Sequence, residues 1–112
     1  MKKGRKRLVA KPLMIVVGRS EGIIGKNSRK IEARHVRRFR YLGFRLFAHQ
    51  YEEARGKWRV SEFTTGYHIP KSFAETRAKA IEQAKAEIDR VGIEGANLAI
   101  ARVIHEEGIA NK

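Results

Sequence analysis

The guanidinium and ammonium groups of one short stretch are the side chains of this sequence with the clearest chemical use. Within residues 29–40, six cations are accompanied by a single acid, Glu32. A guanidinium presents several N–H donors in a plane that matches carboxylate and phosphate oxygens. So many unneutralised cations favour a bound anion or partner over a solvated face. The six are Arg29, Lys30, Arg34, Arg37, Arg38 and Arg40.

The charge is unevenly spread along the 112 residues, whose net charge is +13. Residues 1–40 hold 14 Lys/Arg and 2 Glu for +12, whereas residues 72–112 hold 6 Lys/Arg and 7 acids for −1. A basic segment joined to a near-neutral remainder indicates a polyanion-binding portion on a folded scaffold, and nucleic acid is the commonest polyanion. We expect residues 1–12 to form a flexible arm that either follows phosphates or is merely solvated. The cations of this arm that we predict to bind are Lys2, Lys3, Arg5, Lys6 and Arg7.

The sequence contains little that supports a catalytic role. Residues 18–28 resemble a phosphate-cradling P-loop, but Ser20 stands at its first glycine and Asn27 at its hydroxyl position. The four histidines lack metal-binding spacing, and without cysteine there is no thiolate or disulfide chemistry. The carboxylates at 52, 53 and 62 lie where surface charge is expected. We therefore predict no catalytic residue, no metal site and no cofactor, and a protein that is not an enzyme.

The stretch from Tyr41 to Ile69 is the element that would position these cations. It alternates apolar and polar residues with the period of a strand, which predicts a hairpin and a short third strand. One face would be a core wall, made of Phe44, Leu46, Ala48, Trp58 and Val60. The other mixes bases with aromatics that could stack on single-stranded bases, unless the apolar strand 13–17 or a second subunit covers it. These residues are Arg45, Phe47, His49, Tyr51, Arg59 and Phe63.

Two helices are expected after the sheet. Ser72 and Glu75 form a capping box, which predicts a helix from Phe73 to Val91 that ends at Gly92 and packs an apolar stripe on the core wall. A second helix should run from Ala96 or Asn97 to Glu107. It would complete the core or form a homodimer contact, and we favour the core. Residues 29–40 suit a helix or an extended chain equally well.

The fold class predicted is therefore α+β. A small antiparallel sheet of three to four strands is packed on one face by a helix, with a second short C-terminal helix. Residues 13–112 would form this single domain. No apolar run approaches the roughly 20 residues that a membrane helix needs, so we expect a soluble cytoplasmic protein without a membrane partner.

Residues 42–91 resemble the AP2-type domains, including the arm-binding domains of phage and transposon tyrosine integrases. The matching residues are Gly56-Lys57-Trp58-Arg59-Val60, Gly66, Phe73, Thr76 and Ala80. In that family a three-stranded sheet enters the DNA major groove, so the resemblance implies DNA contacts for Arg45, Arg59 and Lys57. This chain differs in the strand and arginine-rich stretch before the sheet and in the second helix after it.

Together these observations predict a small non-enzymatic nucleic-acid-binding protein, an accessory factor of a phage or mobile element. The residues do not separate DNA from RNA, and we favour DNA. The binding residues would be the eleven cations named above in residues 2–7 and 29–40, together with Arg45, Phe47, Lys57 and Arg59. The alternatives are a basic module or inhibitor that docks on an acidic partner protein, and a ribosome-associated structural protein. A homodimer remains open.

Overall fold

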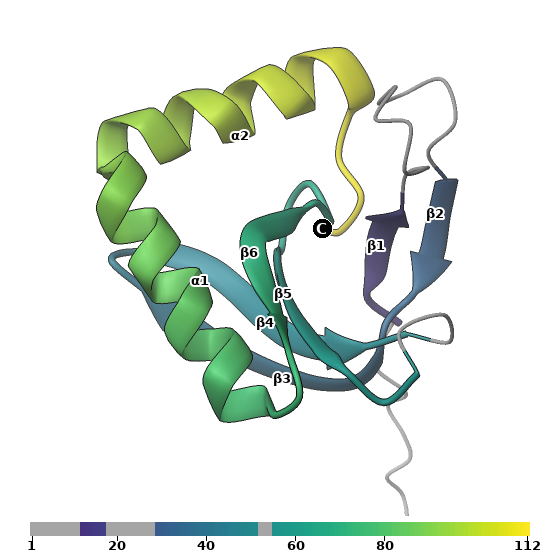
Figure 1. The fold of residues 1–112 in the computed structure, drawn as a ribbon. Coiled ribbons are helices and arrows are strands. Elements are labelled where there is room, and N and C mark those ends of the chain that lie inside the picture. Colours follow the sequence, from purple (N-terminus) through teal and green to yellow (C-terminus); the bar gives the residue numbers. More distant parts are fainter. Residues whose placement is uncertain (1–11, 18–28, 52–54) are drawn as a thin grey trace, which may run out of the picture.

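The computed structural model describes residues 12–17, 29–51 and 55–112 (Figure 1). Residues 1–11 of the basic arm predicted at 1–12, the P-loop-like stretch at 18–28 and Glu52 and Glu53 lie outside these residues. The elements in chain order are β1 (Met14–Val17), β2 (Arg29–Glu32), β3 (Arg34–Tyr41), β4 (Phe44–Gln50), β5 (Trp58–Glu62), β6 (His68–Ala74), α1 (Arg77–Val91) and α2 (Ile93–Glu107). The predicted α+β class is confirmed.

Strands β3 to β6 form one antiparallel four-stranded sheet in sequence order, and β1 pairs with β2 in a separate two-stranded sheet. The register follows from the tight turn at Leu42–Gly43, which sets Tyr41 opposite Phe44 and Arg40 opposite Arg45. Leu46 and Ala48 of β4 then pair with Glu62 and Val60 of β5. Because side chains alternate along each strand, this register fixes which residues share a face.

Helix α1 packs on one face of the sheet, as predicted. Ala80, Ala84 and Ile88 are buried against the core wall, together with Phe44, Leu46, Ala48, Val60 and Ala74. Trp58 and Ile81 pack against this cluster while half-buried. Small alanines along the contacting stripe of the helix bring it close to the sheet, so the first core is a two-layer sandwich of helix on sheet.

The start of α1 differs from the prediction. The helix begins at Arg77, and its N-cap is Thr76, whose hydroxyl accepts a hydrogen bond from the Lys79 backbone N–H at 3.2 Å. Ser72 lies instead in β6, where its hydroxyl is 3.2 Å from both backbone N and O of Val60. Pairing of β6 with β5 as far as Ala74 outcompetes the local capping box. The predicted end at Gly92 is confirmed.

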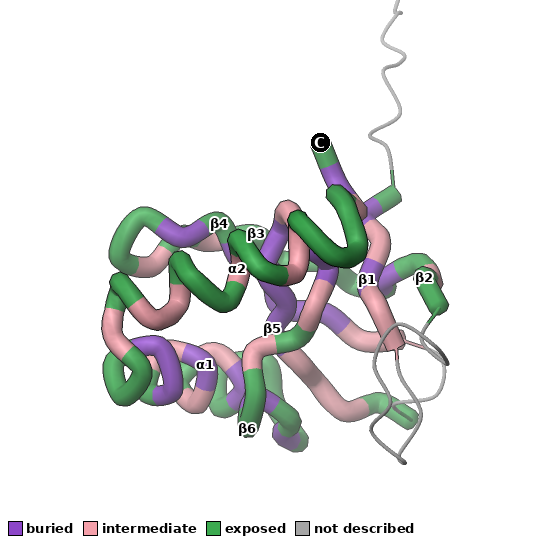
Figure 2. Tube along the Cα trace, turned by 90° about the horizontal axis from the view of Figure 1, so that it is seen from above, coloured by how far each residue is buried: buried purple, intermediate pink, exposed green. Residues whose placement is uncertain are grey.

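Helix α2 begins at Ile93, three residues before the predicted start, and Asn97 does not cap it. Gly92, with φ 90°, turns the chain between the two helices, a conformation that side chains other than glycine rarely adopt. No residue of α2 is fully buried, although Ala96 and Ile100 pack against the core. Figure 2 shows α2 as exposed or intermediate along its whole length. It therefore completes the core only in part.

The β1–β2 hairpin covers part of the other sheet face, on the side of the molecule away from α1 (Figure 1). Its Leu13, Ile15 and Ala33 form a second buried cluster with Phe47 and Phe63. The predicted strand at 13–17 is thus present, and it covers this face, the alternative left open by the sequence. The protein has two apolar cores, one on each face of the sheet.

Asn111 holds β1 in place from the far end of the chain. Its side-chain oxygen accepts from the Met14 N–H at 2.8 Å, and its Nδ2 donates to the carbonyls of Met14 and Phe63 at 3.0 and 2.7 Å. Gly66 closes the contact from the other side, because a Cβ there would lie 2.8 Å from the Met14 carbonyl oxygen. The hairpin is therefore tied to the sheet by specific hydrogen bonds as well as by burial.

No helix among the described residues is long and apolar enough to cross a membrane.

Candidate nucleic-acid interface

The arginine-rich stretch is extended, which settles the helix-or-strand alternative. Residues 29–32 form β2 of the two-stranded sheet, and residues 34–41 form β3, an edge strand of the four-stranded sheet. Phe39 and Tyr41 pack on the core beneath α1. Alternation therefore directs Arg38 and Arg40 to the opposite face, beside the β1–β2 hairpin. Both arginines are exposed.

Three of the predicted arginines meet there. Arg38, Arg40 and Arg45 line a cleft of about 300 Å³ whose wall includes Phe63. We call it the arginine cleft. The guanidinium carbon of Arg45 lies 3.9 Å from the Phe63 ring centroid, and that of Arg38 lies 5.4 Å from it. Cation–π contact with a 4%-exposed ring orients both guanidinium groups while leaving their N–H donors accessible.

The electrostatics of the cleft are unbalanced. Arg40 stands directly opposite Arg45 in the sheet, an arrangement of like charges that destabilises a strand pair. Within the described part of the chain, none of the three guanidinium groups is paired with a carboxylate. The ion pairs recorded there lie elsewhere, as Lys57–Glu75 at 2.8 Å, Lys79–Glu82 at 3.7 Å and Arg90–Glu87 at 2.6 Å. The cleft is therefore suited to an anion.

Phe47 was predicted as a binding residue, and its position removes it from the set. Its side chain is 0% exposed beneath the β1–β2 hairpin, so it has no surface on which a base could stack. Tyr51 is half-buried in the same cluster. The alternation of the sequence placed Phe47 and Tyr51 on the correct face of the sheet. It does not reveal that a hairpin distant in sequence covers this part of the face.

Lys57 and Arg59 lie at the β5–β6 side of the sheet, apart from the arginine cleft. Lys57 is paired with Glu75, and the Arg59 guanidinium stacks 4.7 Å from the Phe73 ring centroid. Both cations already have partners within the fold. They form a second, more neutralised basic region, and β4 separates them from β3.

The other predicted residues do not line the cleft. Arg29, Lys30 and Arg34 are exposed on β2 and β3, and Arg29 and Arg34 each have a partner in the structure. Arg37 is exposed and pairs with Ala48, which faces α1, so it points to the opposite side from Arg38. The five cations predicted in the arm lie outside the described residues. Phe63 was assigned to this face by alternation, but its role beneath two arginines was missed, because it lies in the turn after β5.

A buried histidine–serine pair joins two neighbouring strands of the sheet. His49 Nε2 and Ser61 Oγ are 2.7 Å apart, and the two residues are 0% and 1% exposed. Burial lowers the pKa of His49 to about 4, so the ring is neutral at pH 7. Because both groups are closed off from solvent, the pair links β4 to β5 and presents no nucleophile to a substrate.

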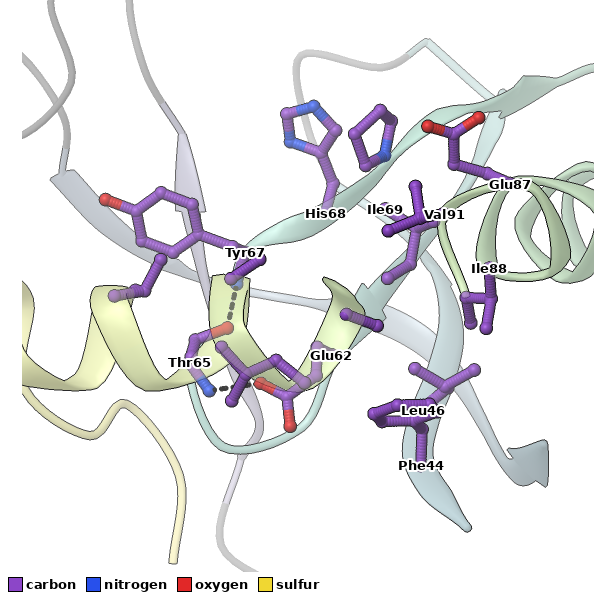
Figure 3. Close-up of a pocket in the computed structure, with 15 residues that line it drawn as sticks. Phe44, Leu46, Glu62, Thr65, Tyr67, His68, Ile69, Glu87, Ile88 and Val91 are labelled. Carbon is purple, nitrogen blue, oxygen red and sulfur yellow. Dashed lines mark hydrogen bonds between the residues drawn. The ribbon is translucent and has the colours of Figure 1, made fainter. Parts of the chain in front are cut away.

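A second, apolar cavity of about 270 Å³ lies between α1, α2 and the sheet (Figure 3). Its walls include Leu46, Ile88 and Ile100. Both carboxylates on it are already engaged: Glu62 accepts from the N–H groups of Thr64 and Thr65 at 3.0 and 2.8 Å, and Glu87 is bound by Arg90. The cavity thus offers mainly apolar contact, and neither of its carboxylates is free of a partner.

No protein-family model, curated protein or solved structure matches this chain. Among the residues that the structure describes, no three His, Asp or Glu side chains come together as metal ligands would. The arginine cleft is the described feature with the most definite chemical preference, and that preference is for phosphate or carboxylate oxygens.

Proposed function

We propose that this protein binds nucleic acid, DNA in preference to RNA, without catalysing a reaction, and that the arginine cleft contacts the phosphate backbone. The observation that carries the proposal is the convergence of Arg38, Arg40 and Arg45 on one solvent-open cleft with no described carboxylate partner. A bound phosphate group would offset the like-charge repulsion between Arg40 and Arg45.

The wider charge distribution supports the same conclusion. The chain carries +12 in its first 40 residues, and residues 34–41 form β3, an edge strand of the four-stranded sheet. A polyanion that follows this edge would release counterions from each phosphate that a cation replaces. If six basic residues meet phosphates, the logarithm of the binding constant should fall with the logarithm of salt concentration with a slope of about −5.

The contact surface differs from the one implied by the AP2-type resemblance. There the exposed sheet face itself enters the major groove, whereas here the β1–β2 hairpin lies over Phe47 and Phe63 on that face. What stays open is the β3–β4 end of the face, which carries arginines and no exposed stacking aromatic. This surface favours backbone contacts to a duplex over stacking on single-stranded bases.

The test is a fluorescence-anisotropy titration of duplex DNA over a salt series with the variant Arg38→Gln/Arg40→Gln/Arg45→Gln. Loss of three phosphate contacts should weaken binding at low salt and reduce the magnitude of the slope by about 2.7. The matched control is Arg77→Gln/Lys79→Gln/Lys112→Gln, which removes three exposed charges far from the cleft in sequence. It should leave the slope nearly unchanged.

The same titration with single-stranded DNA and duplex RNA checks the nucleic-acid class. Tighter binding to RNA than to DNA would overturn the preference for DNA. Equal slopes for the wild type and the cleft variant would remove the arginine cleft from the interface. Absence of any salt-dependent association, with one acidic protein co-purifying instead, would replace nucleic-acid binding by the protein-docking alternative.

A further inference from the structure

The outward face of α2 combines features that its role in the fold does not use. Leu98, at its centre, is 69% exposed, more than any other large apolar side chain described. The inward side of the helix is accounted for, since Ala96 and Ile100 pack on the core and Ala99 and Val103 line the apolar cavity. Leu98 points away from Ala96 and Ile100, because residues two positions apart lie about 160° around the helix from each other.

The neighbours of Leu98 on this face are arranged symmetrically about it. Residues three and four positions away lie on the same side of a helix. Three positions away are two small residues, Gly95 and Ala101, and four positions away are two opposite charges, Glu94 and Arg102. All four are exposed or half-buried. None of the ion pairs or side-chain hydrogen bonds recorded among the described residues engages Glu94 or Arg102.

Such a pattern is self-complementary. When a helix packs antiparallel on a copy of itself about a twofold axis at Leu98, each residue before Leu98 meets the residue equally far after it on the partner. Glu94 then faces Arg102 of the second copy, and Arg102 faces its Glu94. Gly95 faces Ala101, so the two helices can approach closely around the two Leu98 side chains.

We propose that the outward face of α2 binds a second copy of this chain, as an antiparallel helix pair centred on Leu98. The charge distribution favours this occupant. Residues 93–107 carry one Arg and three Glu, so two copies that meet there keep their basic segments out of the contact. A partner of strong single charge would leave either Glu94 or Arg102 facing a like charge.

The expected dimer is modest in size and reversible. One helix pair buries less area than the roughly 1,200 Å² at which stable interfaces begin, so we expect dissociation in the micromolar range. The dimer would carry two arginine clefts, one on each chain. Its formation does not depend on the proposed function, because α2 contributes no residue to the cleft.

Sedimentation velocity over a concentration series tests the proposal without nucleic acid. Leu98→Asp should make the protein monomeric, because two carboxylates would meet on the axis. Glu94→Arg and Arg102→Glu should each weaken self-association by about tenfold or more, since each places like charges in contact twice. Glu82→Arg, on the exposed side of α1, is the matched control and should leave the dissociation constant unchanged.

The decisive measurement mixes the two charge variants. A chain with Glu94→Arg and a chain with Arg102→Glu are complementary at both contacts, so an equimolar mixture should dimerise at least about tenfold more tightly than either variant alone. The double variant should also dimerise. Far-ultraviolet circular dichroism confirms that each variant is folded. A wild-type protein that stays monomeric throughout, or a mixture that associates no better than its components, overturns the proposal.

Discussion

The two faces of the four-stranded sheet are covered by different elements of the fold. On one face, α1 follows the sheet directly in sequence and covers Leu46, Ala48 and Val60 with alanines and isoleucines. On the other, β1 and β2 come from earlier in the chain and cover only Phe47, Phe63 and their neighbours. The difference leaves one face closed and the other divided between a small core and an open arginine cleft.

This division explains how a basic sheet can fold at all. The cations of β3 and β4 that lie beside the hairpin stay in solvent, and the ring of Phe63 belongs both to the second core and to the cation–π contacts of the cleft. The covered part of the face therefore supplies stability and the open part supplies charge. Phe63 joins the two.

The largest expected effect tests whether the hairpin side is a true core. Phe47→Ala removes a ring that is 0% exposed, and we expect it to lower the free energy of unfolding by about 3–5 kcal/mol. Phe44→Ala on the helix side, where the ring is 8% exposed, should cost a similar amount. Urea unfolding followed by circular dichroism measures both.

Comparing Phe47→Ala with Phe44→Ala distinguishes a tightly packed hairpin from a loosely docked one. If the hairpin were only loosely docked, water would already reach Phe47, and its replacement would cost far less than that of Phe44. A cost for Phe47→Ala below about 1 kcal/mol would place it among surface substitutions and would contradict the second core.

The second prediction concerns pH and the buried histidine of the hairpin side. Burial holds the pKa of His49 at about 4 in the folded protein, against about 6.5 when unfolded. The folded state therefore binds fewer protons than the unfolded state between these values, and stability is lost as the pH falls from about 6.5 to about 4. The shift of about 2.5 units corresponds to about 3 kcal/mol.

Urea unfolding at a series of pH values checks this contribution by comparison with His49→Gln. The variant should lose the part of the stability difference between pH 7 and pH 4 that is due to this ring. The part due to His68, whose pKa burial also lowers to about 4, remains in both proteins. Parallel pH profiles for the two proteins would mean that His49 is solvated, contrary to its 0% exposure.

Alternation along residues 44–60 was enough to predict the helix side of the sheet from sequence. Leu46, Ala48 and Val60 are apolar at strand spacing, and α1 supplies a matching stripe nearby in the chain. Helix ends marked by glycine were also predictable, as at Gly92, whereas the start of α1 was not. The Ser72 capping box is a local signal, and pairing of β6 with β5 competes with it.

For the hairpin side of the sheet, the sequence predicted only alternatives: an open face, or a face covered by the strand at 13–17 or by a second subunit. Whether the Phe47 side chain is buried depends on β1, which precedes it by 30 positions. It also depends on Asn111, whose amide binds the Met14 backbone from 97 positions away. No periodic pattern encodes such contacts. The arginines of the cleft were all among the predicted residues, but their grouping depends on the register that sets Arg40 opposite Arg45.

The smallest expected effect tests the open part of the hairpin side by a gain in stability. Arg40→Glu replaces a like-charge pair with Arg45 by an opposite-charge pair, and we expect it to stabilise the fold by about 0.5 kcal/mol in urea unfolding. The same change should weaken DNA binding, because it puts a carboxylate into the arginine cleft.

Arg37→Glu is the matched control. Arg37 lies opposite Ala48, so this variant changes the net charge by the same amount without relieving a facing cation. A substitution that improves folding while it impairs binding would identify Arg40 as a residue kept for its ligand, whereas equal stabilities of the two variants would show that the facing arginines do not repel.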